Sequence, residues 1–486
     1  MPPMSAAERS TTSDLTVAVL GLGVVGGEVA AALLRDEAAA PRRFAPADGR
    51  PLRLAAVHTR TAAALARHGI PAAYARATAK ELVGARAGSA ATPSAAPATA
   101  ASAATSPTPP TPPATPAHLG ALVETIGGIE PAHAYLVDAL ERGIPVATAN
   151  KAVVAAFGPE LEALSRRTGA ALRFEAAVGG GTPVLTPIAE SLAANRLTRV
   201  RGIVNGTTNF ILTAMTRDGA GYEETLRSAQ ERGYAEADPS GDVEGRDPAN
   251  KLVLLVRLAF GRWIRPDAIP LAPPTLDPDA APRPGITGVT GATIAGAAAL
   301  GCRVKLIADA TLAADGTLAT AVLPTIVPLD DPFATTDGVL NRVEVWGDPI
   351  GTVAFVGPGA GGPATSTAVL ADLLAIARGA GSTWGGLPPA TDATEASTAS
   401  TAATGPSTAP APATTPAYAP DAPRDWFAVA PIGATRIPAL PGTRVAELDG
   451  AVAIRFADRT LADVRAVLRD AGAPGTTQIL PAERAS

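Results

Sequence analysis

The sequence predicts an α/β protein with a doubly wound parallel sheet in its N-terminal part, a mixed α/β region after it, and a short α+β tail. Three observations favour this class. Apolar, β-branched runs alternate with helical runs between residues 15 and 151, which is typical of βαβ units. A glycine cluster separates the first predicted strand from the first predicted helix. With 486 residues, 47% of them hydrophobic, the chain can furnish two or three cores.

The first domain is expected over residues 15–151, after an N-terminal tail at 1–14. Its elements follow from short β-branched runs and longer runs with apolar residues at helical spacing. We predict that strands and helices alternate in the order 16–23, 24–37, 52–60, 61–69, 121–128, 132–143 and 144–151.

Two segments differ in composition from the rest, 88–117 and 388–420. Both consist mainly of Ala, Pro, Ser and Thr, with very few charges or large aliphatic side chains. Such segments cannot bury enough surface to offset the entropy of ordering, so we expect both to be disordered. The first interrupts the α/β alternation as a loop insertion, and the second reads as a linker.

Composition and charge narrow the function classes. A formal charge of −5 gives no basic field for a polyanion, so we expect a small-molecule partner and no nucleic acid. The single cysteine, Cys302, allows no internal disulfide and suits a reducing cytoplasm. The stretch 286–300 is too short and too rich in Gly and Thr to span a bilayer, so no membrane is expected.

The glycine cluster G-L-G-V-V-G predicts a Rossmann-type nucleotide-binding turn. Gly21 would turn the chain, Gly23 would let the backbone approach a pyrophosphate, and Gly26 would let the helix pack closely on the strand. The phosphates would lie at the first turn of the helix, beside Val24 and Val25. A purely structural glycine turn is the alternative.

The second predicted strand ends without a carboxylate. An acidic residue there would hold the ribose 2′-hydroxyl of NAD, but this strand ends in His58, Thr59 and Arg60. Basic side chains suit the 2′-phosphate of NADP, so NADP is favoured, with Arg60 as its contact. NAD stays open, because an arginine there can also be a solvated helix start.

An acidic stretch at 233–255, GYAEADPSGDVEGRDPANKLVLL, brings carboxylates and a lysine to the start of an apolar helix. By itself it could be a solvated surface loop. Together with IGGIEPAHAYLVDALERGIPVATANKAVVA, FEAAVGGGTPVL, RGIVNGTTNFIL and GPGAGG, however, it resembles the homoserine dehydrogenase family. These motifs follow the order of that family over most of residues 15–380.

The resemblance implies reversible, NAD(P)H-dependent reduction of L-aspartate 4-semialdehyde to L-homoserine, a step toward threonine, methionine and isoleucine. Reduction of an aldehyde leaves an alkoxide, which needs a proton and positive charge. Lys251 is the implied proton donor, and Glu236, Asp242 and Asp247 are the implied partners of the substrate's ammonium group. Asp247 and Lys251 are four residues apart, so they share one helix face.

Further site residues are carried over from the same resemblance. Lys151 becomes a second site lysine that touches the cofactor or polarises the substrate, and Gly206 and Thr207 of NGTTNF suit the substrate carboxylate. Additional cofactor contacts are implied at Thr125, Gly127 and Gly359. The alternatives are a surface lysine at a helix start and a capped turn.

FEAAVGGGTPVL resembles the monovalent-cation loop of that family. The implied ligands are the side chain of Glu175 and the main-chain carbonyls of Val178, Gly180 and Thr182, an oxygen-only set that suits Na⁺. A glycine turn that leads into a helix is the alternative.

The resemblance also implies the remaining domains. We expect a substrate-binding and dimerisation domain at 152–350, a return segment to the nucleotide domain at 351–387, and a homodimer. The tail at 421–486 has no recognisable ligand-sensing turn. It can be interpreted as a degenerate regulatory domain, and feedback inhibition by threonine is left open. A phosphorylating semialdehyde dehydrogenase is rejected because Cys302 lies in an apolar segment. A catalytically silent nucleotide-binding scaffold remains the alternative function.

Overall fold

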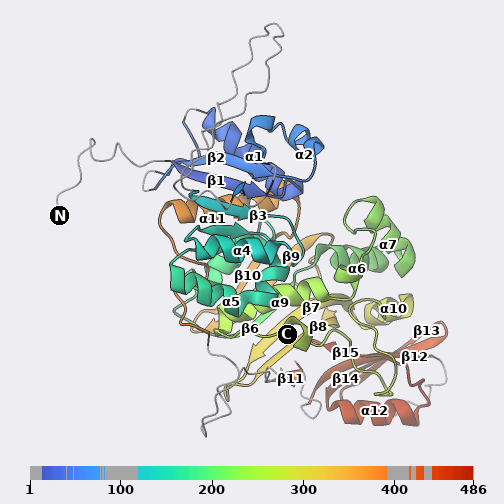
Figure 1. The fold of residues 1–486 in the computed structure, drawn as a ribbon. Coiled ribbons are helices and arrows are strands. Elements are labelled where there is room, and N and C mark those ends of the chain that lie inside the picture. The colour runs from blue at the N-terminus through green and yellow to red at the C-terminus, as the bar shows by residue number, and fades with distance from the viewer. Residues whose placement is uncertain are drawn as a thin grey trace. The chain divides into compact units, whose positions relative to one another are not determined.

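The computed structural model describes residues 14–39, 41–46, 49–76, 78, 81–82, 119–390, 415–416, 423–431 and 440–484 (Figure 1). The insertion expected at 88–117 and most of the linker expected at 388–420 lie outside these residues. Two compact units divide the chain. The first unit comprises Met1–Gly181 with Gly361–Gly386, and the second comprises Thr182–Ala360 with Leu387–Ser486.

Within its described residues, the first unit contains a five-stranded parallel sheet in the order β2-β1-β3-β4-β5. The strands are buried along nearly their whole length, because helices cover a parallel sheet on both faces. This arrangement confirms the predicted doubly wound α/β class. The strands are β1 (Leu15–Leu20), β2 (Leu52–His58), β3 (Ala121–Glu124), β4 (Val146–Thr148) and β5 (Leu172–Arg173).

The helices of this unit follow its strands, as the alternation predicts. They are α1 (Val24–Glu37), α2 (Ala62–Arg67), α4 (Ala132–Glu141), α5 (Lys151–Thr168) and α11 (Gly362–Ala377). The boundary expected at residue 151 coincides with the first residue of α5, inside this unit. Helix α11 comes from the far end of the chain, and its buried residues Val369 and Leu373 join the core formed by β1, β2 and α1.

The second unit is built on a mixed sheet. Its order among the described strands is β10-β9-β6-β7-β8-β15-β12-β14-β13, with β11 also paired to β8. Most pairs are antiparallel, and those of β8 with β15 and β11 are parallel. The strands are β6 (Arg196–Ile203), β7 (Cys302–Leu312), β8 (Leu318–Pro328), β9 (Leu340–Asp348), β10 (Gly351–Pro358), β11 (Thr415–Pro416), β12 (Arg424–Pro431), β13 (Thr443–Leu448), β14 (Ala451–Arg459) and β15 (Ile479–Ala482).

Helices of the second unit carry the acidic stretch. Helix α9 starts after Gly245 and ends before Gly261, both of which adopt the left-handed backbone that glycine tolerates. Its apolar run from Leu252 to Leu258 is buried throughout, which fixes the orientation of the helix. The helices are α6 (Gly206–Asp218), α7 (Tyr222–Glu231), α8 (Ser240–Val243), α9 (Arg246–Phe260), α10 (Gly291–Ala299) and α12 (Leu461–Asp470).

The C-terminal region, expected as a short tail at 421–486, contains β12 to β15 and helix α12 in its described part (Figure 1). Trp426, Ile454 and Val464 belong to a buried core of its own. Strand β15 joins this region to β8, where Ala482 pairs with Ile326. The tail therefore extends the sheet of the second unit.

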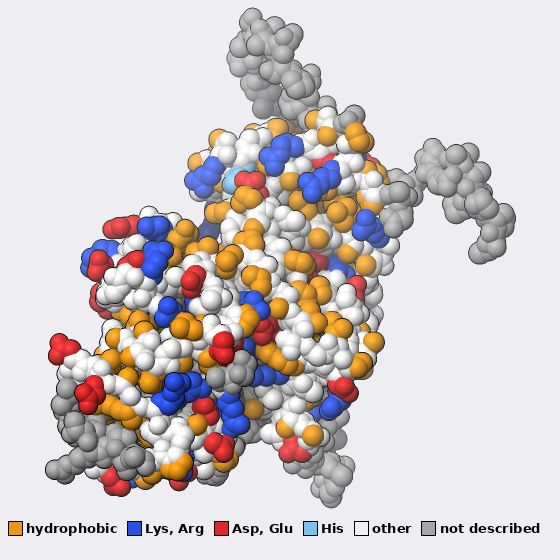
Figure 2. Space-filling view, turned by 180° about the vertical axis from the view of Figure 1, so that it is seen from behind, with side chains coloured by type: hydrophobic (Ala, Val, Ile, Leu, Met, Phe, Trp, Pro, Cys, Tyr) orange, Lys and Arg blue, Asp and Glu red, His pale blue; other side chains and the backbone are white. Residues whose placement is uncertain are grey.

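Surface and helix composition add two facts. On the face drawn in Figure 2, acidic and basic side chains are interspersed among apolar ones. In the part of the chain that the structure describes, no helix has the length and apolar character needed to cross a membrane.

Candidate active site

The turn between β1 and α1 has the geometry that a dinucleotide requires. Gly21 has φ +89°, and a Cβ there would lie 2.9 Å from the Thr125 carbonyl oxygen, so only glycine fits. Gly23 precedes the first helical residue, Val24, and a Cβ on it would meet nothing within 4 Å. Open space therefore adjoins the backbone at the position where a pyrophosphate would approach.

Thr125 and Gly26 hold this turn from the opposite side. The Thr125 hydroxyl donates to the carbonyls of Leu20 (3.1 Å) and Gly21 (2.8 Å). A Cβ on Gly26 would collide with the Gly21 carbonyl and the Thr125 hydroxyl. Gly26 thus allows helix α1 to approach β3, and Thr125 lies beside the predicted cofactor turn.

The end of β2 is basic and partly exposed. The Gly21 amide donates to the His58 carbonyl (3.0 Å), which places the end of β2 beside the glycine turn. The ring Nδ1 of His58 lies 3.1 Å from the Arg76 carbonyl oxygen. Arg60, two residues further along the chain, is exposed.

A buried carboxylate organises the loop after β3. Glu124 is fully buried and accepts from the Thr148 hydroxyl (2.5 Å) and the Ile126 amide (2.8 Å). Burial raises the pKa of its carboxyl. Asn150 caps helix α5 and donates to the Gly128 carbonyl (2.7 Å). Lys151 is the first residue of α5.

Gly127 belongs to the same loop. It has φ +78°, as only glycine readily adopts, and a Cβ on it would meet nothing within 4 Å. The amides of Ile126 and Gly127 both stabilise the Glu124 carboxylate. Gly127 and Lys151 thus lie at the carboxyl ends of β3 and β4, the edge where parallel sheets hold ligands.

In the second unit, Asn205 connects two of the predicted acids. Its side-chain amide nitrogen donates to Asp242 Oδ1 (2.7 Å) and to Asp247 Oδ2 (2.8 Å). Its Oδ1 accepts from the Thr208 amide (2.8 Å), so the same side chain caps helix α6. One amide therefore fixes the distance between two carboxylates from α8 and α9.

Lys251 joins the same cluster. Its Nζ donates to Asp247 Oδ2 (2.8 Å) and to the Val204 carbonyl (2.6 Å), and the residue is 8% exposed. The ion pair has the i,i+4 spacing that the sequence predicts. The structure thus brings together a buried ammonium group and two carboxylates.

Burial raises the pKa of Asp242, and the neighbouring charge of Asp247 raises it further, although the Asn205 hydrogen bond opposes the shift. The two carboxylates lie close enough for the charge of Asp247 to act on Asp242. A bound cation would relieve their repulsion, so the cluster suits an ammonium group.

Gly206 and Thr207 form the first turn of α6, next to this cluster. The Thr207 hydroxyl donates to the Tyr234 carbonyl (2.7 Å), which attaches the acidic loop to the helix. Glu236 is different: it is exposed, and its side chain makes no hydrogen bond or ion pair with any described residue. The structure therefore gathers Asp242, Asp247 and Lys251, and leaves Glu236 outside the hydrogen-bonded cluster.

The predicted cation loop follows β5. Glu175 (4% exposed) begins a single 3₁₀ turn, and its amide donates to Asp372 Oδ2 (2.9 Å). Gly180 has φ +57° and Thr182 is 6% exposed. Among the described residues, no group of three or more His, Cys, Asp or Glu side chains could hold a metal ion.

Gly359 lies in the second unit, directly after β10. A Cβ there would collide with the side-chain amide of Asn341, so the position requires glycine for packing. The GPGAGG motif also contains Gly362, where a Cβ would lie 2.7 Å from the Val24 carbonyl oxygen at the start of α1. In the first unit, then, it is Gly362 that lies beside the cofactor turn.

Sequence reasoning missed several residues of these two sites. The Asn, Gly and Thr donors of NGTTNF are expected at the substrate carboxylate, but Asn205 is not expected to hold the two aspartates, and Glu124, Asn150 and the Val204 carbonyl are not among the predicted site residues. A helix-capping signal was available for both asparagines, since each directly precedes the first residue of a helix. Nothing in the sequence indicates that the Asn205 amide reaches residues 37 and 42 positions away.

The parallel sheet, the open glycine turn and the adjacent buried polar loop define a protein of the dinucleotide-binding α/β class. Residues 21–175 match the family model described as "Homoserine dehydrogenase, NAD binding domain", and residues 183–374 match "Homoserine dehydrogenase". The chain belongs to the homoserine dehydrogenase family, which confirms the predicted resemblance.

Individual relatives agree. A homoserine dehydrogenase from Synechocystis is 41% identical over 261 residues, covering 53% of this chain and 58% of the relative. One from Pseudomonas aeruginosa is 43% identical over 260 residues, covering 54% and 57%. The alignments thus span little more than half the length of these curated relatives. The crystal structure of a homoserine dehydrogenase from Thiobacillus denitrificans superposes with a TM-score of 0.73 at 27% identity, covering 97% of this chain and 98% of that one.

Proposed function

We propose that this protein is an NAD(P)H-dependent homoserine dehydrogenase, which reversibly reduces L-aspartate 4-semialdehyde to L-homoserine. The observation that carries the proposal is the buried Lys251, whose ammonium group is held by Asp247 and the Val204 carbonyl beside a second carboxylate, Asp242. The combination of this ammonium group with two carboxylates favours an enzyme over a silent scaffold, because reduction of an amino acid aldehyde needs a proton donor and partners for the substrate's ammonium group.

The residues of the second unit supply the acid–base part of the reaction. Lys251 gives a proton to the oxygen that becomes the alcohol, and Asp247 orients the lysine. Asp242 and Asp247 bind the substrate's ammonium group, with Glu236 closing over it from the exposed loop. The backbone amides of Gly206 and Thr207, at the positive end of helix α6, receive the substrate carboxylate.

The residues of the first unit fit a nicotinamide dinucleotide, which supplies the hydride when bound. The backbone at Gly21, Gly23 and Gly26 receives the pyrophosphate, and Val24 and Val25 form the first helical turn there. Thr125, Gly127 and Lys151 line the carboxyl edge of the sheet. Arg60 and the basic end of β2 favour the 2′-phosphate of NADP over NAD.

Oxidation of NADPH and NADH in the presence of aspartate semialdehyde tests this function. The unaltered protein should oxidise NADPH faster than NADH. Lys251→Ala should lose activity on the order of a hundredfold or more, the scale of a lost proton donor. Arg246→Ala is the matched control, because Arg246 lies at the exposed start of the same helix and pairs only with Glu244 among the described carboxylates. Near-normal turnover by the Lys251 variant would remove that lysine from its role.

A monovalent cation at 175–182 and a homodimer complete the proposal. Glu175 and the carbonyls of Val178, Gly180 and Thr182 supply oxygen donors of the kind that Na⁺ prefers. Strand β10 is an edge of the described sheet, and Ile350 and Val356 near it are about half exposed (48% and 50%), as a strand covered by a second copy would be. Light scattering measures the oligomeric state. Activity measured with Na⁺ replaced by a tetraalkylammonium ion tests whether the reaction depends on the proposed cation. The reaction is placed in the cytoplasm, where Cys302 would stay reduced.

A further inference from the structure

Lys305 is a second buried lysine in the second unit, and the proposed reaction does not use it. It lies on β7 and is 2% exposed. Its Nζ donates to Asn209 Oδ1 (3.1 Å), the Thr336 carbonyl (2.8 Å) and Asp337 Oδ1 (2.9 Å). A buried ammonium group is retained only where its donors are satisfied. All three donors of this one are directed at α6 and at one loop.

That loop, residues 331–340, is attached to helix α6 by the same group of side chains. The Asn209 side-chain nitrogen donates to the Thr336 carbonyl (3.0 Å) and to the Leu340 carbonyl (3.2 Å). Lys305 and Asn209 therefore share the Thr336 carbonyl and also bond to each other. Strand β7, helix α6 and the 331–340 loop meet at this one junction.

The junction lies one helical turn from the proposed substrate site. Asn205, which holds Asp242 and Asp247, precedes Asn209 by four residues on the chain. A Cβ on Gly206 would lie 3.0 Å from the Val339 carbonyl oxygen, so the 331–340 loop packs directly against the first turn of α6. Movement of this loop would displace the Gly206 and Thr207 amides.

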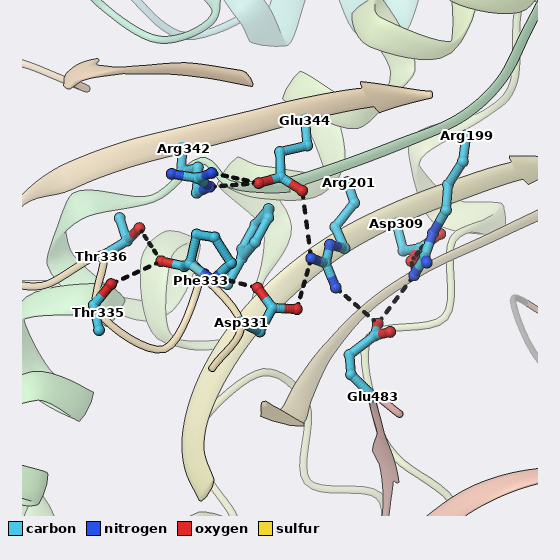
Figure 3. Close-up of polar contacts among 11 residues, drawn as sticks. Arg199, Arg201, Asp309, Asp331, Phe333, Thr335, Thr336, Arg342, Glu344 and Glu483 are labelled. Atoms are coloured by element: carbon cyan, nitrogen blue, oxygen red, sulfur yellow. Dashed lines mark hydrogen bonds and ion pairs between the residues drawn. The ribbon is translucent and has the colours of Figure 1, made fainter. Parts of the chain in front are cut away.

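The other end of the 331–340 loop is also held (Figure 3). Asp331 accepts from the Arg201 guanidinium (2.9 Å) and from the Phe333 amide (2.8 Å). The same guanidinium lies 4.0 Å from the centre of the fully buried Phe333 ring. With this end fixed to β6, Lys305 controls the end that contacts α6.

We propose that Lys305 is a positioning residue for substrate binding. Through Asn209 and the Thr336 carbonyl, it holds the first turn of α6 and the 331–340 loop in the geometry that receives the amino acid's carboxylate. The assignment rests on the proposed function for the identity of the ligand, but the restraint on α6 can be measured without turnover.

Three full-length variants separate positioning from a general structural role. Lys305→Met removes all three hydrogen bonds but keeps the length of the side chain. Lys305→Arg keeps a cation with several donors. Arg303→Met is the matched control, because it removes a cation from the same strand and the Arg303 side chain donates instead to the neighbouring Cys302 carbonyl.

Steady-state kinetics is the first measurement. For Lys305→Met, the KM for aspartate semialdehyde should rise about tenfold, the scale of a lost hydrogen bond to a charged group. The KM for NADPH and the kcat per folded protein should change little. Lys305→Arg should recover most of the loss. A purely structural role would reduce the amount of active protein and leave both KM values unaltered, which would overturn the inference.

Hydrogen exchange of peptides that cover 203–212 and 334–342 is the second measurement. In Lys305→Met these peptides should exchange faster than in the unaltered protein, and peptides from β8 and α9 should not. Uniformly faster exchange over the whole second unit would contradict the inference. If the unaltered protein does not reduce the semialdehyde, the proposed function fails. The exchange pattern alone then decides whether Lys305 restrains the first turn of α6 and the 331–340 loop.

Discussion

The side-chain nitrogen of Asn205 donates to two carboxylates, and the side-chain oxygen of the same residue caps helix α6. An aspartate would retain the cap but add a third negative charge, and an alanine would leave both acids without their shared donor. The residue between β6 and α6 therefore determines how far apart Asp242 and Asp247 lie.

The substitution Asp242→Asn is predicted to raise the stability of the protein and to lower its activity. Because the pKa of Asp242 in the folded state lies above its ordinary 3.8, the ionised carboxylate costs stability once the pH passes through that raised value. At pH 7 the variant should have the higher Tm, and the difference should shrink as the pH falls through the raised pKa of Asp242. Activity on the semialdehyde should drop, since the ammonium group loses a partner.

Thermal unfolding at several pH values, with activity measured in parallel, checks this prediction. Asp238→Asn is the control from the same loop, because Asp238 is exposed and its hydrogen bonds to Ser240 lower its pKa. That variant should show no gain in Tm. An Asp242 variant that is fully active and less stable at pH 7 would contradict the assignment.

At this scale the sequence predicts pairs that are close along the chain. The Asp247–Lys251 spacing indicates a shared helix face, and the structure has their charged atoms 2.8 Å apart. It does not predict that Lys251 also reaches the Val204 carbonyl, or that Glu124 becomes a buried hydrogen-bond centre. Those contacts depend on how separate elements pack, which local spacing does not encode.

At the scale of elements, the β1–α1 turn offers a pair of substitutions with opposite consequences. Gly23→Ala should leave stability unchanged, because a Cβ there meets nothing within 4 Å, yet should weaken NADPH binding on the order of tenfold or more by occupying the approach of the pyrophosphate. Gly26→Ala should destabilise the first unit, because its Cβ collides with the Gly21 carbonyl. Fluorescence titration with NADPH and thermal unfolding of both variants check this.

The two glycine variants control for each other. A Gly23 variant with normal NADPH affinity would show that the pyrophosphate does not pass this position.

The order of strands and helices in this unit was predictable because each element has a local signature. The return of α11 to the first core was expected only from the resemblance, since no local pattern relates Val369 to Val19.

At the scale of the whole molecule, Glu483 ties the last strand to the sheet of the second unit. Its Oε1 lies 3.0 Å from Arg199 Nη2 and 3.4 Å from Arg201 Nη1 (Figure 3). Burial opposes ionisation, but the two guanidinium groups outweigh it and hold the pKa of Glu483 below its usual 4.5. Among the other labelled carboxylates, Asp309 pairs with Arg199 and Asp331 with Arg201.

Glu483→Gln should lower the free energy of unfolding at pH 7 by about 1.5–3 kcal/mol, the range for a hydrogen bond to a charged group. A depressed carboxyl pKa stabilises the folded state above the unfolded value, and this contribution is lost as the pH falls through the folded pKa. The difference should therefore shrink as the pH falls below 4.5 and vanish only below the depressed pKa of Glu483. Urea unfolding followed by tryptophan fluorescence, at pH 7 and at successively lower pH values below 4.5, measures it.

Glu447→Gln on the edge strand β13 is the control and should change nothing, since Glu447 is exposed or nearly so and no ion pair of the described residues includes it. A difference in unfolding free energy between the Glu483 variant and the unaltered protein that stays constant as the pH falls would contradict the prediction.

The sequence indicated a strand and a helix in this region, but not that they continue the sheet of a distant segment. Pairing between Ala482 and Ile326 spans too much chain for local reasoning.

The attachment of β15 to β8 has a consequence for any shortened form of the protein. Strand β8 is eleven residues long and buried almost throughout, with β7 on one side and the C-terminal strands on the other. Cutting the chain after residue 386 would remove the parallel partners of β8 at Ala319, Thr320 and Ile326. The backbone groups freed at these positions could pair with another chain, so we expect the truncated protein to aggregate during expression.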